Sequence, residues 1–164
     1  MFTIRRSEWD DVPALLDVYQ QGNASNFVAD SRQTIGLLEV MDWQEASSDR
    51  HPLLVVEHQG ELIAWCSLEP FYGLPAFDRA LEVSLYVLPK WQGHGLGKQF
   101  LQHLDCHHAD IGFTHLVAYL YATNHHSLAL FTGQRFEQWG RLPSIASHNG
   151  VAEDVLLLGR IYSC

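Results

Sequence analysis

The chain has 164 residues, enough for one domain with a single apolar core. It carries 19 acidic and 10 basic side chains, and the resulting net charge of −9 argues against nucleic acid or an anionic membrane as a partner. The three cysteines have no metal-like spacing and neither end carries a signal-like or long apolar run, so the sequence predicts a reduced, cytoplasmic protein.

The N-terminal part of the chain predicts a strand and two helices. Residues 2–5 alternate like a short strand, and Pro13 after acidic residues marks the first turn of a helix. The apolar stripe expected on this helix consists of Val12, Leu15, Leu16 and Tyr19. Residues 22–31 predict a mobile loop before a weaker amphipathic helix. The apolar side chains expected on this second helix are Ile35, Leu38 and Met41.

Strands and helices alternate through the rest of the chain. Apolar runs at 53–57 and 62–68 flank a turn at 58–61, which predicts a hairpin. The following elements are a strand at 81–88, a helix that buries Leu96, Phe100, Leu101 and Leu104, a strand at 114–119, a short helix from Asn124 to Phe131, and final strands near 136 and 155–158. This order predicts a single α/β domain over residues 1–164, with a mixed sheet and helices on both faces.

Three glycines, Gly93, Gly95 and Gly97, connect the strand at 81–88 to the next helix. The first N–H groups of a helix have no partner within it, so a loop without obstructing side chains can bind a phosphate there. A Walker-type loop fits poorly, because the glycine spacing is too short and Gln99 replaces the hydroxyl residue. A Rossmann loop also fits poorly, because this strand lies mid-chain. The basic side chains nearest the predicted anion site are Lys90, His94 and Lys98.

The segment Gln92-Gly93-His94-Gly95-Leu96-Gly97 resembles the pyrophosphate loop of the GNAT acetyltransferase superfamily in residue type and context. The strand Glu82-Val83-Ser84-Leu85-Tyr86-Val87 is similar to that of the branch containing phosphinothricin acetyltransferase and related small-molecule amino-acid N-acetyltransferases. Further matches to this branch are Asn124, Ser127 and Leu128, then Gly140-Arg141-Leu142, Gly150 and Asp154. Matches in this order extend over essentially the whole chain.

This resemblance implies the GNAT fold, with a central, mostly antiparallel sheet, a splayed central strand pair and helices on both faces. It also implies acetyl-CoA as the donor, direct transfer to the primary amine of a small molecule, and a homodimer. The residues that would bind acetyl-CoA are Leu85, Tyr86 and Val87 on the splayed strand, Gln92, Gly93, His94, Gly95, Leu96, Gly97 and Lys98 in the loop, and Asn124 and Ser127 at the mouth of the splay. Asn124 also suits a helix cap.

Glu82 is the candidate catalytic residue. The alternation of the strand places Glu82, Ser84 and Tyr86 on one face and Leu81 and Val83 on the other. A carboxylate between packed layers can have a raised pKa, which suits it to remove the ammonium proton of an acceptor amine directly or through water. The alternative interpretation is a structural carboxylate that pairs with Arg79.

Two departures from the branch concern the general acid and the acceptor. Many relatives carry a tyrosine where this chain has Phe131, so water, Tyr119 or Tyr121 would have to protonate the leaving thiolate. The arginine or lysine residues that the branch places against the acceptor are missing before the catalytic strand and again at 146–154. We therefore expect a cationic or apolar amine instead of an acidic amino acid. The residues expected at the acceptor site are Phe71, Tyr72 and Glu82.

Two other functions remain open from the sequence. Peptide or protein N-acetylation would need an open groove, and a non-catalytic acyl-CoA-binding regulator would be consistent with Phe131. A regulator, however, has little need for a base at Glu82. His103 and His107 have a zinc-like helical spacing, but the sequence places no carboxylate partner with them, so we expect exposed histidines and no metal.

Overall fold

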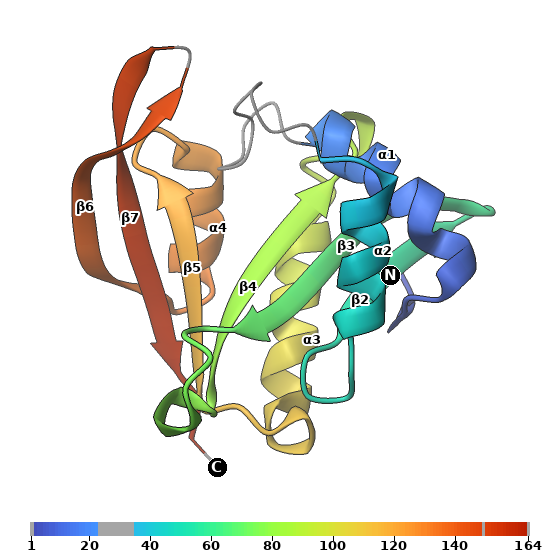
Figure 1. Cartoon of the computed structure of the whole chain (residues 1–164), viewed down its shortest axis with the longest axis horizontal. Coiled ribbons are helices and arrows are strands. Elements are labelled where there is room, and N and C mark those ends of the chain that lie inside the picture. The colour runs from blue at the N-terminus through green and yellow to red at the C-terminus, as the bar shows by residue number, and fades with distance from the viewer. Residues whose placement is uncertain (1, 23–34, 149, 164) are drawn as a thin grey trace.

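The computed structural model describes residues 2–22, 35–148 and 150–163 (Figure 1). Its strands are β1 (Ile4–Arg6), β2 (Leu53–His58), β3 (Glu61–Pro70), β4 (Ala80–Val87), β5 (His115–Tyr121), β6 (Glu137–His148) and β7 (Val151–Ile161). Its α-helices are α1 (Val12–Gly22), α2 (Leu37–Ala46), α3 (Leu96–Ile111) and α4 (His125–Gly133). Short 3-10 turns lie at Trp9–Asp11, Pro75–Phe77 and Pro89–Trp91.

The strands form one sheet in the order β1-β2-β3-β4-β5-β7-β6. Neighbouring strands are antiparallel except β4 and β5, whose parallel pairing covers Ala80 to Glu82 against His115 to Val117. Beyond Glu82 the two strands diverge, as Figure 1 shows. The predicted mixed, mostly antiparallel sheet with a splayed central pair is therefore confirmed.

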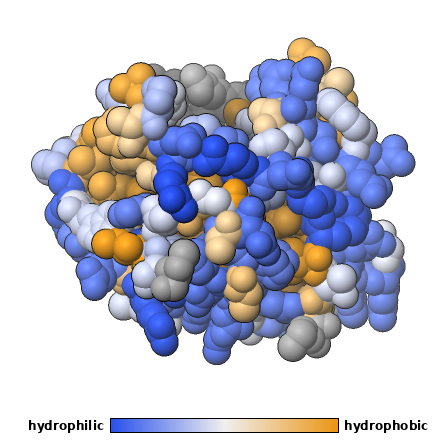
Figure 2. Space-filling model, turned by 90° about the horizontal axis from the view of Figure 1, so that it is seen from below, coloured by the Kyte–Doolittle hydropathy of each residue, from blue (hydrophilic) through white to orange (hydrophobic). Residues whose placement is uncertain are grey.

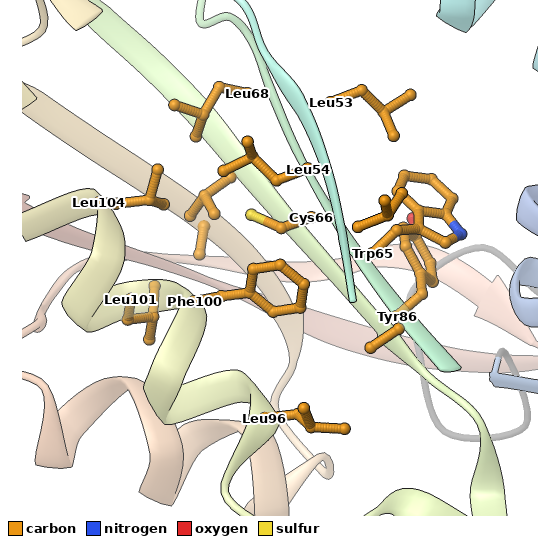
Figure 3. Packing of buried hydrophobic residues seen from close by; sticks show 14 of the residues in the cluster. Leu53, Leu54, Trp65, Cys66, Leu68, Tyr86, Leu96, Phe100, Leu101 and Leu104 are labelled. Atoms are coloured by element: carbon orange, nitrogen blue, oxygen red, sulfur yellow. The ribbon is translucent and has the colours of Figure 1, made fainter. Parts of the chain in front are cut away.

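Helices cover both faces of the sheet, also as predicted. In Figure 1, α1 and α2 lie in front of β2 to β4, while α3 and α4 lie behind the sheet. Figure 3 shows the consequence for the core, with Trp65 and Tyr86 on one side of the strands and Phe100 and Leu101 on the other. The side chains expected to be buried on α3, Leu96, Phe100, Leu101 and Leu104, are all buried.

The hairpin predicted at 53–68 is also confirmed. Gln59 and Gly60 both have positive φ, 52° and 80°, as a tight turn that follows the twist of the strands requires. β2 then pairs with β3 in register, with Leu54 opposite Cys66 and Val55 opposite Trp65. None of the described helices is long and apolar enough to cross a membrane.

Two predictions about the N-terminal helices are wrong. On α1, Leu16 was expected to be buried but is only half-buried. Val18, which was not expected in the buried stripe, is buried instead. On α2, the buried side chains are Val40 and Gln44, whereas Leu38 is 74% exposed, so Leu38 does not form the packed face. The loop predicted at 22–31 lies outside the described residues, except for Gly22, which is the last residue of α1.

Candidate active site

The glycine loop lies between the end of β4 and the start of α3. Gly93 and Gly95 have φ values of 81° and 80°, which glycine adopts without strain. Gly95 caps α3, and a Cβ at Gly93 or Gly95 would meet no atom within 4 Å, so the space above the loop is open. The Gln92 side chain donates a hydrogen bond of 3.2 Å to the carbonyl of Val87, which ties the loop to the splayed strand.

A cavity of about 400 Å³, here called the loop cavity, opens over this helix start. Its walls include Leu85 and Val87, the loop residues Gln92, Gly93, Gly95, Leu96, Gly97 and Lys98, and Ser127 and Leu130 of α4. Helices α3 and α4 approach each other closely here. A Cβ added to Gly97 of α3 would lie only 2.6 Å from Cδ2 of Leu130 on α4. Of the three basic residues expected nearby, Lys98 lines the cavity, while Lys90 forms an ion pair of 2.9 Å with Glu61.

A narrower cavity of about 100 Å³, the splay cavity, lies where β4 and β5 separate. It is lined from β4 by residues 82–86 and from the other side by Tyr119, Leu120, Asn124, Ser127, Leu130 and Phe131. It shares Leu85, Ser127 and Leu130 with the loop cavity. Asn124 caps α4, accepting a hydrogen bond of 3.2 Å from the Ser127 N–H, so its predicted cap role is confirmed.

On the opposite face of the sheet, residues of α1, α2, β2, β3 and β4 line a third, partly open cavity of about 370 Å³, the α1–α2 cavity. Glu82, Ser84 and Tyr86 line it together, as the strand alternation predicted. The same three residues also line the splay cavity, so Glu82 lies where the two faces of the sheet connect.

Glu82 is half-buried and forms no ion pair with Arg79 in the described part of the chain. The structure therefore does not support the alternative interpretation, in which Glu82 is a structural carboxylate that pairs with Arg79. Burial raises the pKa of Glu82, and the carboxylate of Glu69 raises this pKa further. A raised pKa is what a carboxylate needs to accept a proton near neutral pH.

Tyr119 is the tyrosine across the splay from Glu82. It lines the splay cavity, and burial together with the nearby Glu82 raises the pKa of its phenol, so it keeps its proton. Phe131 also lines this cavity but is only 3% exposed and packs against Phe136. Phe131 has no hydroxyl, so the role of Tyr119, Tyr121 or water as the proton donor stays a prediction.

The structure does not bring Phe71 and Tyr72 to the α1–α2 cavity. Phe71 lines a separate hollow with Phe77, His115 and Trp139, while Tyr72 is 66% exposed and its ring packs against Phe77. Their role at an acceptor site stays a prediction.

The sequence reasoning missed several residues that line the α1–α2 cavity. These are Tyr19, Trp43, His51, Trp65, Ser67 and Glu69. Only the register of β3 against β4 places Glu69 opposite Glu82, and a long irregular connection precedes β4, so no local pattern could have indicated this pairing. The paired histidines His103 and His107 stack at 4.2 Å, and no group of three or more potential metal ligands occurs among the described residues.

Comparisons with known proteins agree with this geometry. Residues 12–136 match the family model described as the acetyltransferase (GNAT) family. YwnH of Bacillus subtilis (strain 168), provisionally named a phosphinothricin acetyltransferase, is 33% identical over 96% of this chain and 98% of its own length. A crystal structure provisionally described as a phosphinothricin N-acetyltransferase superposes with a TM-score of 0.92 and 33% identity over 99% of both chains.

A more distant structure shows the same fold. It is yncA from Salmonella typhimurium, solved with its cofactor acetyl-CoA, with a TM-score of 0.90 and 24% identity over 99% of this chain and 95% of its own. The glycine loop at the start of α3, beside a sheet that opens at the half-buried Glu82, agrees with the class of acyl-CoA-dependent transferases that these comparisons indicate. The chain belongs to the GNAT acetyltransferase family, and it is an acetyl-CoA-dependent N-acetyltransferase. The open glycine loop at the start of α3 fits the pyrophosphate of acetyl-CoA.

Proposed function

We propose that this chain acetylates the primary amine of a small molecule by direct attack, with Glu82 as the general base. The observation that carries the proposal is the position of Glu82, which lines both the α1–α2 cavity and the splay cavity. An acceptor in the first cavity and a donor that reaches the second from the loop cavity would therefore meet beside one carboxylate.

Each side chain then has a defined task. Bound acetyl-CoA supplies a thioester whose carbonyl carbon is open to a neutral amine. Glu82 accepts the ammonium proton of the acceptor, and the backbone N–H groups near Leu85 and Val87 stabilise the developing negative charge at the splay. Tyr119 donates a proton to the leaving thiolate. The loop from Gln92 to Lys98 holds the pyrophosphate through backbone N–H groups and the Lys98 ammonium.

The size of the acceptor cavity favours a small molecule. At about 370 Å³ the α1–α2 cavity accommodates a compact amine, and its described walls come from two helices and three strands. A peptide acceptor would need an extended groove along the sheet. YwnH carries a name that refers to phosphinothricin, itself a small amine, which supports the same substrate class.

We also propose a homodimer that works in the cytoplasm without nucleic acid or membrane. Support comes from the net charge of −9 and from exposed apolar side chains on the β6–β7 hairpin, namely Trp139, Ile145 and Val151. Exposed apolar side chains that lie close together commonly mark an interface. The turn that Ile145 and Val151 flank lies at the top of Figure 1, whereas Figure 2 shows the molecule from below, where the surface is mostly hydrophilic.

The experiment is a turnover screen with the purified chain, acetyl-CoA and a panel of primary amines, with free thiol release as the readout and mass spectrometry of the product. We expect stoichiometric thiol and N-acetylated amine for at least one small amine. A peptide with a free N-terminus serves as the comparison arm. Acetyl-CoA binding without thiol release from any acceptor would overturn the proposal in favour of a regulator, and turnover of the peptide alone would replace the substrate class.

A further inference from the structure

A second carboxylate lies next to Glu82 in the α1–α2 cavity. Glu69 on β3 is the register partner of Glu82 on β4, and both side chains line this cavity. Residues directly opposite each other on antiparallel strands have Cβ atoms about 4.5–5.5 Å apart. The two carboxylates therefore face the same small volume.

The described cavity wall offers no permanent positive charge to this pair. It contains no lysine or arginine, and His51 is its one basic side chain. The ion pairs found among the described residues involve neither Glu69 nor Glu82. Like charges directly opposite each other on a sheet are destabilising, so a cation that binds between them gains more than it would beside a single carboxylate.

Aromatic side chains form the wall beside the two carboxylates. Ring centroids are 4.4 Å apart for Trp65 and Tyr86, 5.2 Å for Tyr86 and Tyr19, 5.3 Å for Tyr19 and Trp43, and 5.8 Å for Trp43 and Trp65. Figure 3 shows Trp65 and Tyr86 side by side. Aromatic faces attract ammonium groups and exclude water, whereas a carboxylate gains nothing from them. The aromatic wall therefore favours a positively charged group, as the two carboxylates do.

We propose that Glu69 is a specificity-determining residue that selects acceptors with a second positive charge, so that the preferred substrates are small diamines without a carboxylate. The inference rests on the proposed function, because it takes Glu82 as the base for the attacking amine. Glu69 binds the second ammonium group, which keeps its proton throughout, while the first ammonium gives its proton to Glu82. An acceptor carboxylate in this cavity would meet two like charges. Glu69 is exposed to solvent near the end of β3, and partial desolvation of its carboxyl raises its pKa, which is consistent with a carboxylate that lacks a cation in the free protein.

The test compares three amines with the same carbon chain and different ends, 1-aminobutane, 1,4-diaminobutane and 4-aminobutanoate. For the unaltered protein we expect kcat/KM to fall in the order diamine, monoamine, amino acid. In Glu69→Gln the preference for the diamine over the monoamine should fall by about tenfold or more, when both rates are measured in the same variant at the same pH. Glu69→Asp, which keeps the charge, should retain most of the preference.

A matched control is Glu57→Gln. Glu57 lies on the neighbouring strand β2, where its carboxylate binds Arg5 at 3.0 Å outside the cavity, so this variant should keep the unaltered preference. Circular dichroism and the melting temperature show whether each variant folds. If Glu69→Gln misfolds, the diamine preference of the unaltered protein and of Glu69→Asp tests the inference instead. Turnover of the amines without a diamine preference, or with a preference that survives Glu69→Gln, overturns this inference alone. No turnover of any amine overturns the proposed function as well.

Discussion

At Glu82 two effects act on the pKa in the same direction. Burial between the helices and the sheet disfavours the charged form, and the facing carboxylate of Glu69 disfavours it again. Tyr86 and Tyr119 also border this carboxylate, and both keep their protons because their pKa values are raised. A proton on Glu82 is therefore held more firmly than a proton on an exposed glutamate.

This arrangement predicts the pH dependence of the rate. A general base works only when it is deprotonated, so kcat/KM should rise with pH through the raised pKa of Glu82. Glu69→Gln removes one of the two causes, so the rise should move to lower pH. The measurement is kcat/KM for 1-aminobutane against pH in both proteins. An unchanged profile would show that Glu69 does not act on the titrating group.

Tyr119 permits a second prediction at the scale of single residues. If its hydroxyl protonates the leaving thiolate, Tyr119→Phe should lower kcat by up to about 10²-fold with little change in acetyl-CoA affinity. Tyr162→Phe is the matched control, because Tyr162 is a buried tyrosine that does not line the splay cavity. Steady-state kinetics would measure kcat of both variants, and calorimetry would measure their affinity for acetyl-CoA. Equal rates in both variants would assign the proton to water.

Among the elements, the glycine loop combines backbone conformation with open space. Gly95→Asp should abolish acetyl-CoA binding, because it adds bulk and negative charge where the phosphate is expected. Gly60→Asp introduces the same residue at the same φ of 80°, also without a neighbour within 4 Å, but in the β2–β3 turn. Calorimetry should therefore show lost affinity for the first variant alone. Unchanged affinity in Gly95→Asp would contradict the loop assignment.

The elements also show which parts of the fold could be predicted from the sequence. Local signals were sufficient for the β2–β3 hairpin and for α3, because the turn residues and the buried stripe lie within each segment. The buried face of α2 was predicted wrongly, because its apolar residues surround the helix, so contacts with α1 decide which side packs. The pairing of Glu69 with Glu82 depends on register between segments separated by an irregular connection, and register there is set by tertiary packing.

For the whole molecule, the splay between β4 and β5 connects cavities on the two faces of the sheet. The loop cavity and the α1–α2 cavity lie on opposite sides, and the splay cavity shares residues with both. The sequence resemblance predicted the splay and the loop, since their motifs are local. It could not predict the wall of the α1–α2 cavity, because Tyr19, Trp43 and Glu69 come from three separate elements.

The association state gives a further prediction at this scale. A homodimer should have twice the mass of the chain by light scattering at micromolar concentration. Ile145→Lys on the exposed part of β6 should lower that mass if the β6–β7 hairpin forms the interface, whereas Leu38→Lys, at an exposed position on α2, should not. A mass equal to one chain for the unaltered protein would contradict the dimer.

The central claim is that Glu82 is the base of an N-acetyltransferase, and the most direct measurement is kcat together with acetyl-CoA affinity for Glu82→Gln. We predict that kcat falls about 10²- to 10⁴-fold while the dissociation constant of acetyl-CoA changes by no more than a few-fold. Glu57→Gln should match the unaltered protein in both quantities. Full activity of Glu82→Gln, with the same pH profile as the unaltered protein, would contradict the claim and assign Glu82 a structural role.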